Sequence, residues 1–204
     1  MKTKIVKPNE IETIIKYLNS GKVIAFKTDT VYGFSCSAKD ENACKKIVEM
    51  KGRENKPMLL LVGEKTDYKK YVKTNSTAEK LIQNFWPGAL TIIFEQNFDF
   101  NEYITCGKNT IGVRMPKDDL CEKILCGIDY PIVSTSANIS GENQLNSASE
   151  ILEKFDGKVD LIVDSGVCTN FLPSTIVLTN KNDVTILREG VILKTEIEKV
   201  LRSE

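Results

Sequence analysis

The chain has 204 residues with 28 basic and 28 acidic side chains, so its formal net charge is zero. This balance excludes a protein whose whole surface binds nucleic acid, but it is compatible with a local basic cleft. The sequence contains no histidine, which excludes Ser-His-Asp and Cys-His catalysis and most transition-metal sites. No apolar run approaches the roughly 18 residues of a membrane span, and the N-terminus lacks the apolar core of a signal peptide. The six cysteines form no C-x-x-C pair. We therefore expect a cytoplasmic protein with reduced cysteines.

The first half of the chain alternates between amphipathic helices and apolar strands. Asn9 with Glu12 three residues later predicts the capped start of a first helix, which Gly21 ends. The elements expected next are a strand over 22–26, a polar connection over 27–33, a helix over 40–50, a strand over 58–62, a helix over 76–85, a strand over 90–94 and a polar connection over 95–109. Because the run over 58–62 is apolar throughout, we expect its strand to be covered on both faces.

The second half continues the alternation until its last two strands, which have no helix between them. Capping pairs at Ser147 with Glu150 and at Thr195 with Glu198 predict the starts of two helices. The other expected elements are a strand over 111–115, a helix over 118–125, a strand beginning near Ile132, and strands over 159–164, 174–179 and 184–187. This order predicts one α/β domain over residues 1–204, an open twisted sheet of mixed strand direction flanked by helices.

Polar side chains gather where the predicted strands end, most clearly in the segment Pro131–Gly141. Two apolar strand residues there are followed by hydroxyls, an amide and a glycine, a composition that suits the binding of phosphate or carboxylate oxygens at the mouth of a sheet. The alternative is a Ser/Asn-rich turn that caps a helix.

Four cations also lie next to the ends of predicted strands: Arg53 and Lys56 precede a strand, Arg114 comes late in one, and Arg188 ends another. Together they predict a concave cationic cleft, because a triphosphate carries about four negative charges near neutral pH. The alternatives are a solvated loop around Lys51–Lys56 and a surface ion pair for Arg114. The chain has neither G-x-x-x-x-G-K-[ST] nor G-x-G-x-x-G, so a nucleotide would bind without a P-loop or a dinucleotide fingerprint.

Seven segments in order resemble the threonylcarbamoyl-AMP synthase family, also called YrdC-like proteins. They span residues 27–190 and read KTDTVYGF, KGRENKPM, FWPGALTII, TIGVRMP, PIVSTSANISG, PSTIVLT and ILREG. The chain departs from the family pattern at Lys27, where proline is usual, and in the basic loop, which is one residue shorter before Pro57. The resemblance implies a YrdC-like fold in its short form, without the extra C-terminal domain of some relatives.

The resemblance also implies an activity, in which L-threonine, bicarbonate and ATP give threonylcarbamoyl-AMP and pyrophosphate. The product would pass to a transferase complex that modifies adenosine at position 37 of tRNA, and Mg²⁺ would accompany the phosphates of ATP. The implied threonine-binding residues are Thr30, Arg114, Ser134 and Ser174. The implied ATP-binding residues are Lys51, Arg53, Lys56, Thr110, Ser136, Asn138 and Arg188. No catalytic base and no protein metal ligand are assigned, although Asp29 is a candidate for magnesium or for capping a turn.

Residue chemistry agrees with these roles. Arg114 can pair through two N–H groups with a carboxylate, and the hydroxyls of Thr30 and Ser174 suit a small polar amino acid. Nucleotidyl transfer needs mainly positioning and charge stabilisation, so the lack of histidine is no obstacle. Two other functions stay open: a cleft that binds double-stranded RNA or tRNA without catalysis, and an enzyme of this fold acting on another carbamoyl or sugar-phosphate substrate.

Overall fold

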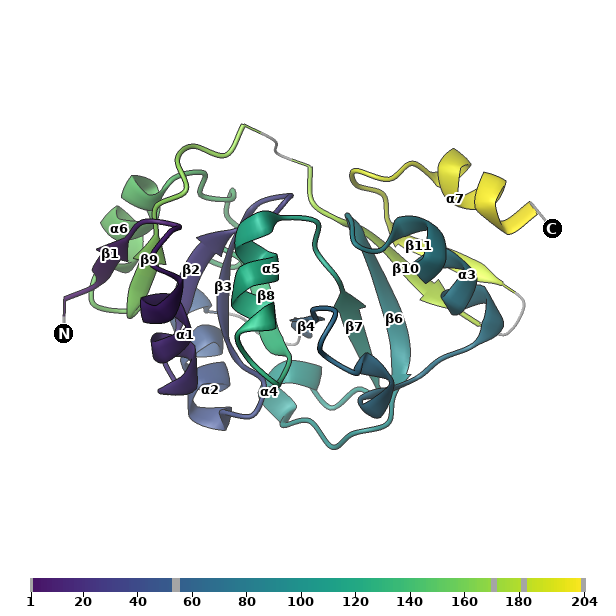
Figure 1. Cartoon of the computed structure of the whole chain (residues 1–204), viewed down its shortest axis with the longest axis horizontal. Helices are drawn as coiled ribbons and strands as arrows, with labels where there is room; N and C mark the ends of the chain where they lie inside the picture. The colour runs from purple at the N-terminus through teal and green to yellow at the C-terminus, as the bar shows by residue number, and fades with distance from the viewer. Residues whose placement is uncertain (1, 53–55, 170–171, 181–182, 203–204) are drawn as a thin grey trace.

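The strands of the chain form one continuous mixed sheet in a computed structural model that describes residues 2–52, 56–169, 172–180 and 183–202 (Figure 1). The strands are β1 (Lys4–Val6), β2 (Ile24–Lys27), β3 (Tyr32–Ser37), β4 (Leu59–Leu61), β5 (Val72–Lys73), β6 (Leu90–Gln96), β7 (Thr110–Arg114), β8 (Ile132–Ser136), β9 (Leu161–Val163), β10 (Thr175–Thr179) and β11 (Val184–Arg188). Their order across the sheet is β1-β9-β2-β3-β8-β4-β7-β6-β10-β11, and β5 pairs with β6. The predicted mixed α/β sheet is confirmed.

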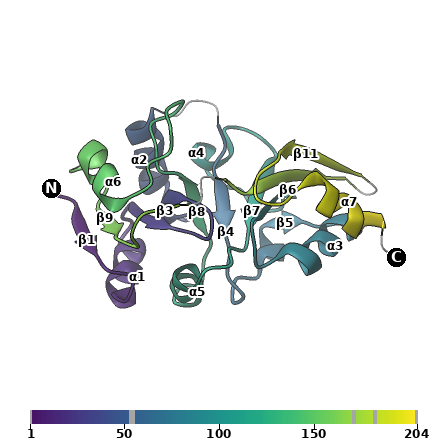
Figure 2. The same ribbon diagram turned by 90° about the horizontal axis from the view of Figure 1, so that it is seen from above.

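Helices cover this sheet on both faces. They are α1 (Ile11–Asn19), α2 (Glu41–Lys51), α3 (Ser76–Phe85), α4 (Glu102–Thr105), α5 (Asp119–Cys126), α6 (Ala148–Phe155) and α7 (Lys194–Arg202), with a short 3₁₀ turn at Tyr68–Lys70. Figure 2 shows α1 and α5 on one side of the sheet and α2 and α4 on the other. None of the helices in the described part of the chain has both the length and the apolar character needed to cross a membrane.

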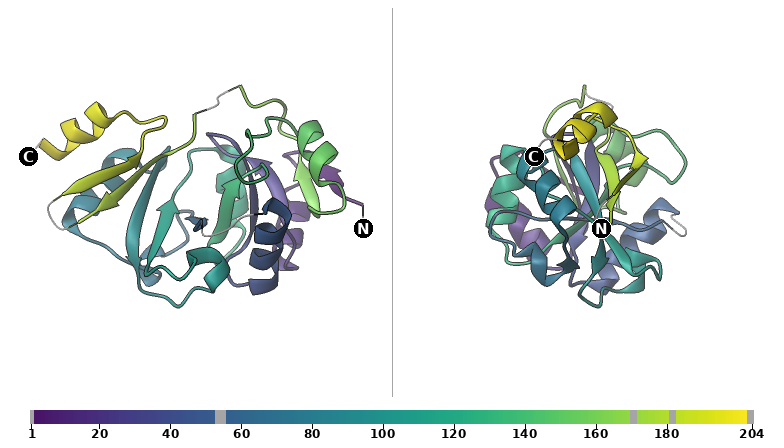
Figure 3. Two further views of the ribbon diagram at one scale, coloured as in Figure 1. Left: turned by 180° about the vertical axis from the view of Figure 1, so that it is seen from behind. Right: turned by 90° about the vertical axis from the view of Figure 1, so that its right-hand side faces the viewer.

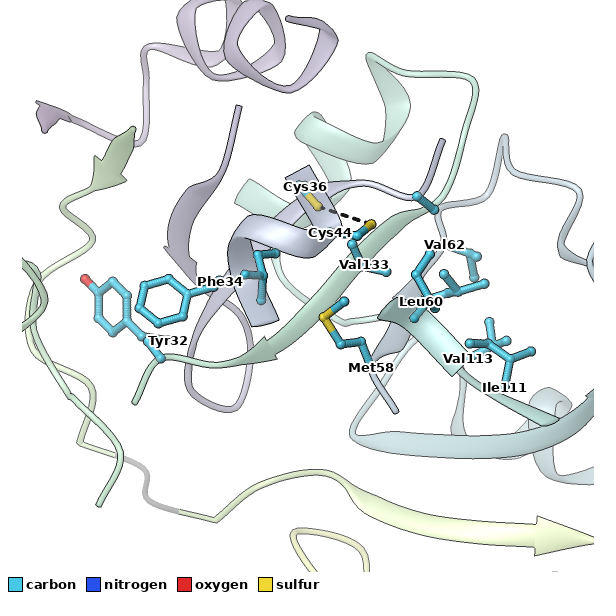
Figure 4. Packing of buried hydrophobic residues seen from close by; sticks show 14 of the residues in the cluster. Tyr32, Phe34, Cys36, Cys44, Met58, Leu60, Val62, Ile111, Val113 and Val133 are labelled. Carbon is cyan, nitrogen blue, oxygen red and sulfur yellow. Dashed lines mark hydrogen bonds between the residues drawn. The ribbon is translucent and has the colours of Figure 1, made fainter. Parts of the chain in front are cut away.

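Two buried clusters lie on opposite faces of the sheet, because successive strand residues point to opposite sides. In β4, Leu60 belongs to the cluster that includes residues of α2 and α6, and Leu61 belongs to the cluster under α1 and α5. Figure 4 shows part of the first cluster, where the thiols of Cys36 and Cys44 lie 3.8 Å apart. Leu60 and Leu61 are both almost fully buried, which confirms that this apolar strand is covered on both faces.

The connection from β9 to β10 carries the chain from one end of the sheet to the other. β9 pairs with β1 and β2, whereas β10 pairs with β6 and β11. Seen from behind in Figure 3, residues 164–169 leave β9 along one side of the molecule, and β1 and α7 lie at opposite ends of its long axis. In the centre of the sheet, β3 and β4 from the first half of the chain alternate with β8 and β7 from the second half.

The structure corrects several predicted elements. The polar connection predicted over 27–33 includes the first two residues of β3, and no strand was predicted over 34–37, because Gly33 and Ser35 interrupt the apolar residues. These two small residues face the side opposite to Tyr32 and Phe34. The connection predicted over 95–109 contains α4, and the strands β1 and β5 were not predicted.

Two of the three predicted capping pairs are wrong. The N-cap of α1 is Glu10, not Asn9, and Thr195 lies inside α7. At α6, by contrast, the Ser147 side chain accepts a hydrogen bond from the Glu150 backbone N–H, as predicted.

Candidate functional site

A row of directly paired residues across four strands forms the floor of the site. Ser134 of β8 lies opposite Leu59 of β4, Leu59 lies opposite Gly112 of β7, and Gly112 lies opposite Ile93 of β6. Paired residues point to the same face, and here it is the face on which Leu61 packs under α1 and α5.

A cavity of about 230 Å³ lies over this row. Its lining is rich in hydroxyl groups from segments far apart in the sequence: Thr28, Thr30, Val31, Gly33, Pro57, Met58, Leu59, Thr91, Ile93, Gly112, Ser134, Thr135, Ser136, Gln144, Pro173, Ser174, Ile176 and Arg188. Pockets for drug-sized ligands begin at roughly 300 Å³, so this volume suits a smaller polar molecule such as an amino acid. A nucleoside triphosphate would have to extend beyond it.

Hydroxyls and a guanidinium meet on one wall of the cavity. The Thr91 and Ser174 hydroxyl oxygens lie 2.8 Å apart, and Arg188 Nη2 donates to the Ser174 carbonyl over 2.8 Å. Desolvation and the neighbouring positive charge of Arg114 both lower the pKa of the Arg188 guanidinium. The two arginines are therefore close enough to influence each other electrically, and their joint positive charge favours an anion between them.

Arg114 lies behind the opposite wall, with 4% of its side chain exposed. Its Nε donates to the Gly88 carbonyl over 2.9 Å, Nη1 donates to the Thr30 hydroxyl over 2.9 Å, and Nη2 donates to Asp29 Oδ1 over 2.6 Å. Burial lowers the pKa of Arg114, and the Asp29 carboxylate opposes this shift. The alternative of an ion pair for Arg114 is thus partly right, but the pair is buried and touches a hydroxyl that lines the cavity.

Lys51 ties the end of α2 to the loop that follows β8. Its ammonium group, 2% exposed as a residue, donates to the carbonyls of Ser136 and Asn138 and to Asn138 Oδ1. The Ser136 hydroxyl donates to the same Oδ1 over 2.6 Å, and the Ser140 N–H donates to the Lys51 carbonyl over 2.8 Å. These bonds fix the backbone of the Ser/Asn-rich segment beside the cavity.

The structure brings many of the predicted site residues together. Those that line the cavity are Thr30, Ser134, Ser136, Ser174 and Arg188. Arg114 reaches the cavity through Thr30, and Lys51 and Asn138 support Ser136 from behind. Thr110 lies two residues from Gly112 along β7, on the same face, and Lys56 is exposed beside the lining residue Pro57. Arg53 lies outside the described residues, so the cationic cleft stays a prediction.

Several lining residues were not predicted from the sequence. Thr91 sits in an apolar strand and its hydroxyl meets Ser174, so a threonine within the run LTIIF was a usable signal. Gly112, in the middle of β7, was another such signal, because a glycine inside a strand often marks a close approach to a ligand. Thr28 and Gln144 carried no signal that separates them from ordinary loop residues.

Comparisons with known proteins identify relatives of this chain. Residues 16–190 match the model of the Sua5–YciO–YrdC family, which carries the description telomere recombination. A Methanocaldococcus jannaschii protein is 34% identical over 99% of both chains. A Pyrococcus abyssi protein named threonylcarbamoyl-AMP synthase is 36% identical over 91% of this chain, which spans 55% of that protein's length. A Bacillus subtilis protein of the same name is 33% identical over 90% of this chain, which spans 54% of that protein's length.

Solved structures show the same fold. The crystal structure of P. abyssi Sua5 complexed with L-threonine superposes with a TM-score of 0.89 at 33% identity, covering 98% of this chain and 60% of that one. The crystal structure of Escherichia coli YciO superposes with a TM-score of 0.83 at 23% identity, covering 93% of this chain and 96% of that one. At this identity the likeness shows a shared fold and nothing more. The matched segment, the relatives and the shared fold agree, and the chain belongs to the Sua5–YciO–YrdC family that includes these threonylcarbamoyl-AMP synthases.

Proposed function

We propose that this protein is an L-threonylcarbamoyladenylate synthase, a nucleotidyltransferase that converts L-threonine, bicarbonate and ATP into threonylcarbamoyl-AMP and pyrophosphate. The observation that carries the proposal is the single cavity shared by Thr30, Ser134, Ser174 and Arg188, with Arg114 bonded to Thr30. The likeness to a Sua5 structure that holds L-threonine supports the same assignment.

The cavity provides groups for each part of an amino acid. The Thr30 hydroxyl, which accepts a hydrogen bond from a cation, becomes a stronger donor toward a carboxylate. The hydroxyls of Ser134 and Ser174 can serve the substrate's ammonium or hydroxyl group. We therefore place threonine over the floor residues Leu59 and Gly112.

ATP would lie at the rim, with its α-phosphate toward the threonine. In the reaction the threonine amine attacks the carbon of bicarbonate, water leaves, and the resulting carbamate oxygen attacks the α-phosphorus to displace pyrophosphate. Arg188 and the rim residues Lys51, Arg53, Lys56, Thr110, Ser136 and Asn138 would hold the nucleotide and offset its charge. The described residues contain no cluster of three His, Cys, Asp or Glu side chains, so we propose that Mg²⁺ arrives bound to the triphosphate.

We further propose that residues 1–204 form one domain, which the continuous sheet supports, and that the protein acts in the cytoplasm. Its product would pass to a tRNA-modifying transferase complex, with at most a weak direct contact to tRNA.

The test is pyrophosphate release by the purified protein. We expect release only when ATP, bicarbonate and threonine are all present, and a product with the mass of threonylcarbamoyl-AMP. Release that does not need threonine, or that follows another amino acid better, would contradict the proposal. A protein that releases no pyrophosphate but binds tRNA with a steep salt dependence would instead support the RNA-binding alternative.

Replacing Arg114 tests the threonine site directly. Arg114→Ala removes the cation that polarises Thr30, so the KM for threonine should rise by about tenfold or more while the KM for ATP changes by less than about twofold. Steady-state kinetics with each substrate varied in turn measures both KM values. The variant Arg114→Lys keeps the positive charge, and it controls for a loss of threonine binding that is caused only by unfolding of the protein. Equal effects on both substrates would contradict the assignment.

A further inference from the structure

Asp29 joins two parts of the sheet that are not neighbours. It lies between β2 and β3, yet its Oδ1 accepts from Arg114, the last residue of β7, over 2.6 Å. Its Oδ2 accepts from the backbone N–H of Lys117, beyond the end of β7, over 3.2 Å. Because β3, β8 and β4 separate β2 from β7 in the sheet, the segment that carries Asp29 reaches across the end of three strands.

This bridge indicates what Asp29 does in the protein. Both carboxylate oxygens have a partner, and 15% of the side chain is exposed. Its role is therefore that of a counter-ion to a buried guanidinium, which would otherwise be costly to hold in this place.

The same bridge determines the orientation of the Arg114 guanidinium. Arg114 is held by oxygens of three separate segments, at Gly88, Thr30 and Asp29. A guanidinium has five N–H groups, and the hydrogen bonds between described residues use three of them. Nη1 and Nη2 each have one further N–H, and Nη1 is the nitrogen that bonds Thr30, a residue of the cavity lining.

We propose that Asp29 is a positioning residue of the amino-acid site, which fixes the Arg114 guanidinium against the Thr30 hydroxyl so that the pair is preorganised for a substrate carboxylate. The assignment rests on the proposed function. Preorganisation matters because a charge already held in place needs no rearrangement when the anion arrives.

The test compares Asp29→Asn with a matched control, Asp160→Asn. Asp160 also accepts from a backbone N–H, that of Val23 over 2.9 Å, and from a cation, Lys46 over 2.6 Å, with 14% of its side chain exposed. It does not line the cavity. The Lys46 side chain is 37% exposed against 4% for Arg114, so Asp29→Asn should cost more stability than Asp160→Asn. The positioning role is therefore judged from the kinetics, by the split between the KM for threonine and the KM for ATP.

We expect Asp29→Asn to raise the KM for threonine by about tenfold or more, the range typical of partners that orient a binding group, with the KM for ATP within about twofold of the parent. Calorimetric titration with threonine alone should show the same weakening. Asp160→Asn should leave both quantities unchanged. If the asparagine variant does not fold, Asp29→Glu, which keeps the charge but displaces the carboxylate, should give the same threonine-specific loss.

Equal behaviour of the Asp29 and Asp160 variants, or a loss shared equally by ATP, would overturn the positioning role. This outcome differs from failure of the proposed function itself, in which the unaltered protein would show no pyrophosphate release that depends on all three substrates.

Discussion

A missing side chain shapes the binding site at the scale of single residues. Gly112 occupies the centre of the cavity floor, and a Cβ built there would lie 3.2 Å from Ile93 Cδ1, 3.3 Å from Thr91 Cγ2 and 3.5 Å from Leu59 Cβ. These are tight contacts with side-chain atoms that can shift slightly. The glycine therefore provides volume for the ligand, and a larger residue would occupy that volume.

Gly112→Val should abolish threonine binding while it leaves the fold intact. We expect a cost of less than about 2 kcal/mol in the free energy of unfolding, because a β-branched residue suits a strand and the new methyl groups enter the cavity rather than the core. Threonine affinity should fall more than tenfold, and Gly112→Ala should show a smaller loss. Urea unfolding and calorimetry measure the two effects; unchanged affinity in the valine variant would place the ligand elsewhere.

The limits of sequence reasoning are also visible at single residues. Ser134 and Ser136 could be predicted because they follow an apolar strand, and the structure places both in the cavity lining. The partner of Arg114 could not be chosen from the sequence, because Asp29 comes 85 positions earlier and meets it only through the strand order of the sheet. Asp29 was a candidate magnesium ligand, whereas its two oxygens bind Arg114 and Lys117.

At the scale of elements, Lys51 is the contact that joins α2 to the loop after β8. Lys51→Met keeps the length of the side chain but leaves the carbonyls of Ser136 and Asn138 without this donor. The Ser136 carbonyl keeps the Asn138 N–H as a donor over 3.1 Å, so the main cost falls on the Asn138 carbonyl. A buried unsatisfied carbonyl costs about 1–3 kcal/mol, so we expect a loss of about 2 kcal/mol in the free energy of unfolding. Hydrogen exchange at the Ser140 amide, which bonds to the Lys51 carbonyl, should accelerate.

The control for this prediction is Lys45→Met on the same helix. Lys45 is half exposed, and its salt bridge within the described part of the chain is to Glu49 one turn away, an arrangement worth about 0.5 kcal/mol or less. If both variants lose the same stability, the loop does not depend on Lys51.

Element boundaries were predictable where a local pattern decides them. α3 spans Ser76–Phe85 as predicted, because its apolar spacing and the Trp-Pro-Gly that follows are local signals. β3 could not be predicted in the same way, since its small residues Gly33 and Ser35 make sense only once β8 lies beside them. A Cβ at Gly33 would come within 2.9 Å of Ser134 Oγ, so the close approach of these two strands requires glycine there.

At the scale of the whole molecule, the titration of carboxylates sets the dependence of stability on pH. Hydrogen bonds from Thr3 lower the pKa of Asp156, and a hydrogen bond from Lys7 lowers that of Asp164. Burial raises the pKa of Glu79, but hydrogen bonds from Lys69 and Thr74 outweigh this and bring it below its usual value.

A pKa that is lower in the folded state means that the stabilisation is complete above the unfolded pKa of about 4 and is lost as the pH falls through the folded value. With no histidine in the chain, the urea midpoint should be nearly constant between about pH 6 and 8 and should fall below about pH 4. Glu79→Gln should reduce the acid-induced fall. A marked change in the midpoint between pH 6 and 7 would contradict this account.

The long passage from β9 to β10 also bears on how the protein is made. Ser174 and Arg188 belong to one wall of the cavity, and the ribosome adds them after strands β1 to β9 have been synthesised. A nascent chain that ends before Ser174 has the floor residues of the pocket but lacks these two side chains. Competence to bind is thus acquired only once β10 and β11 have been made and β10 pairs with β6.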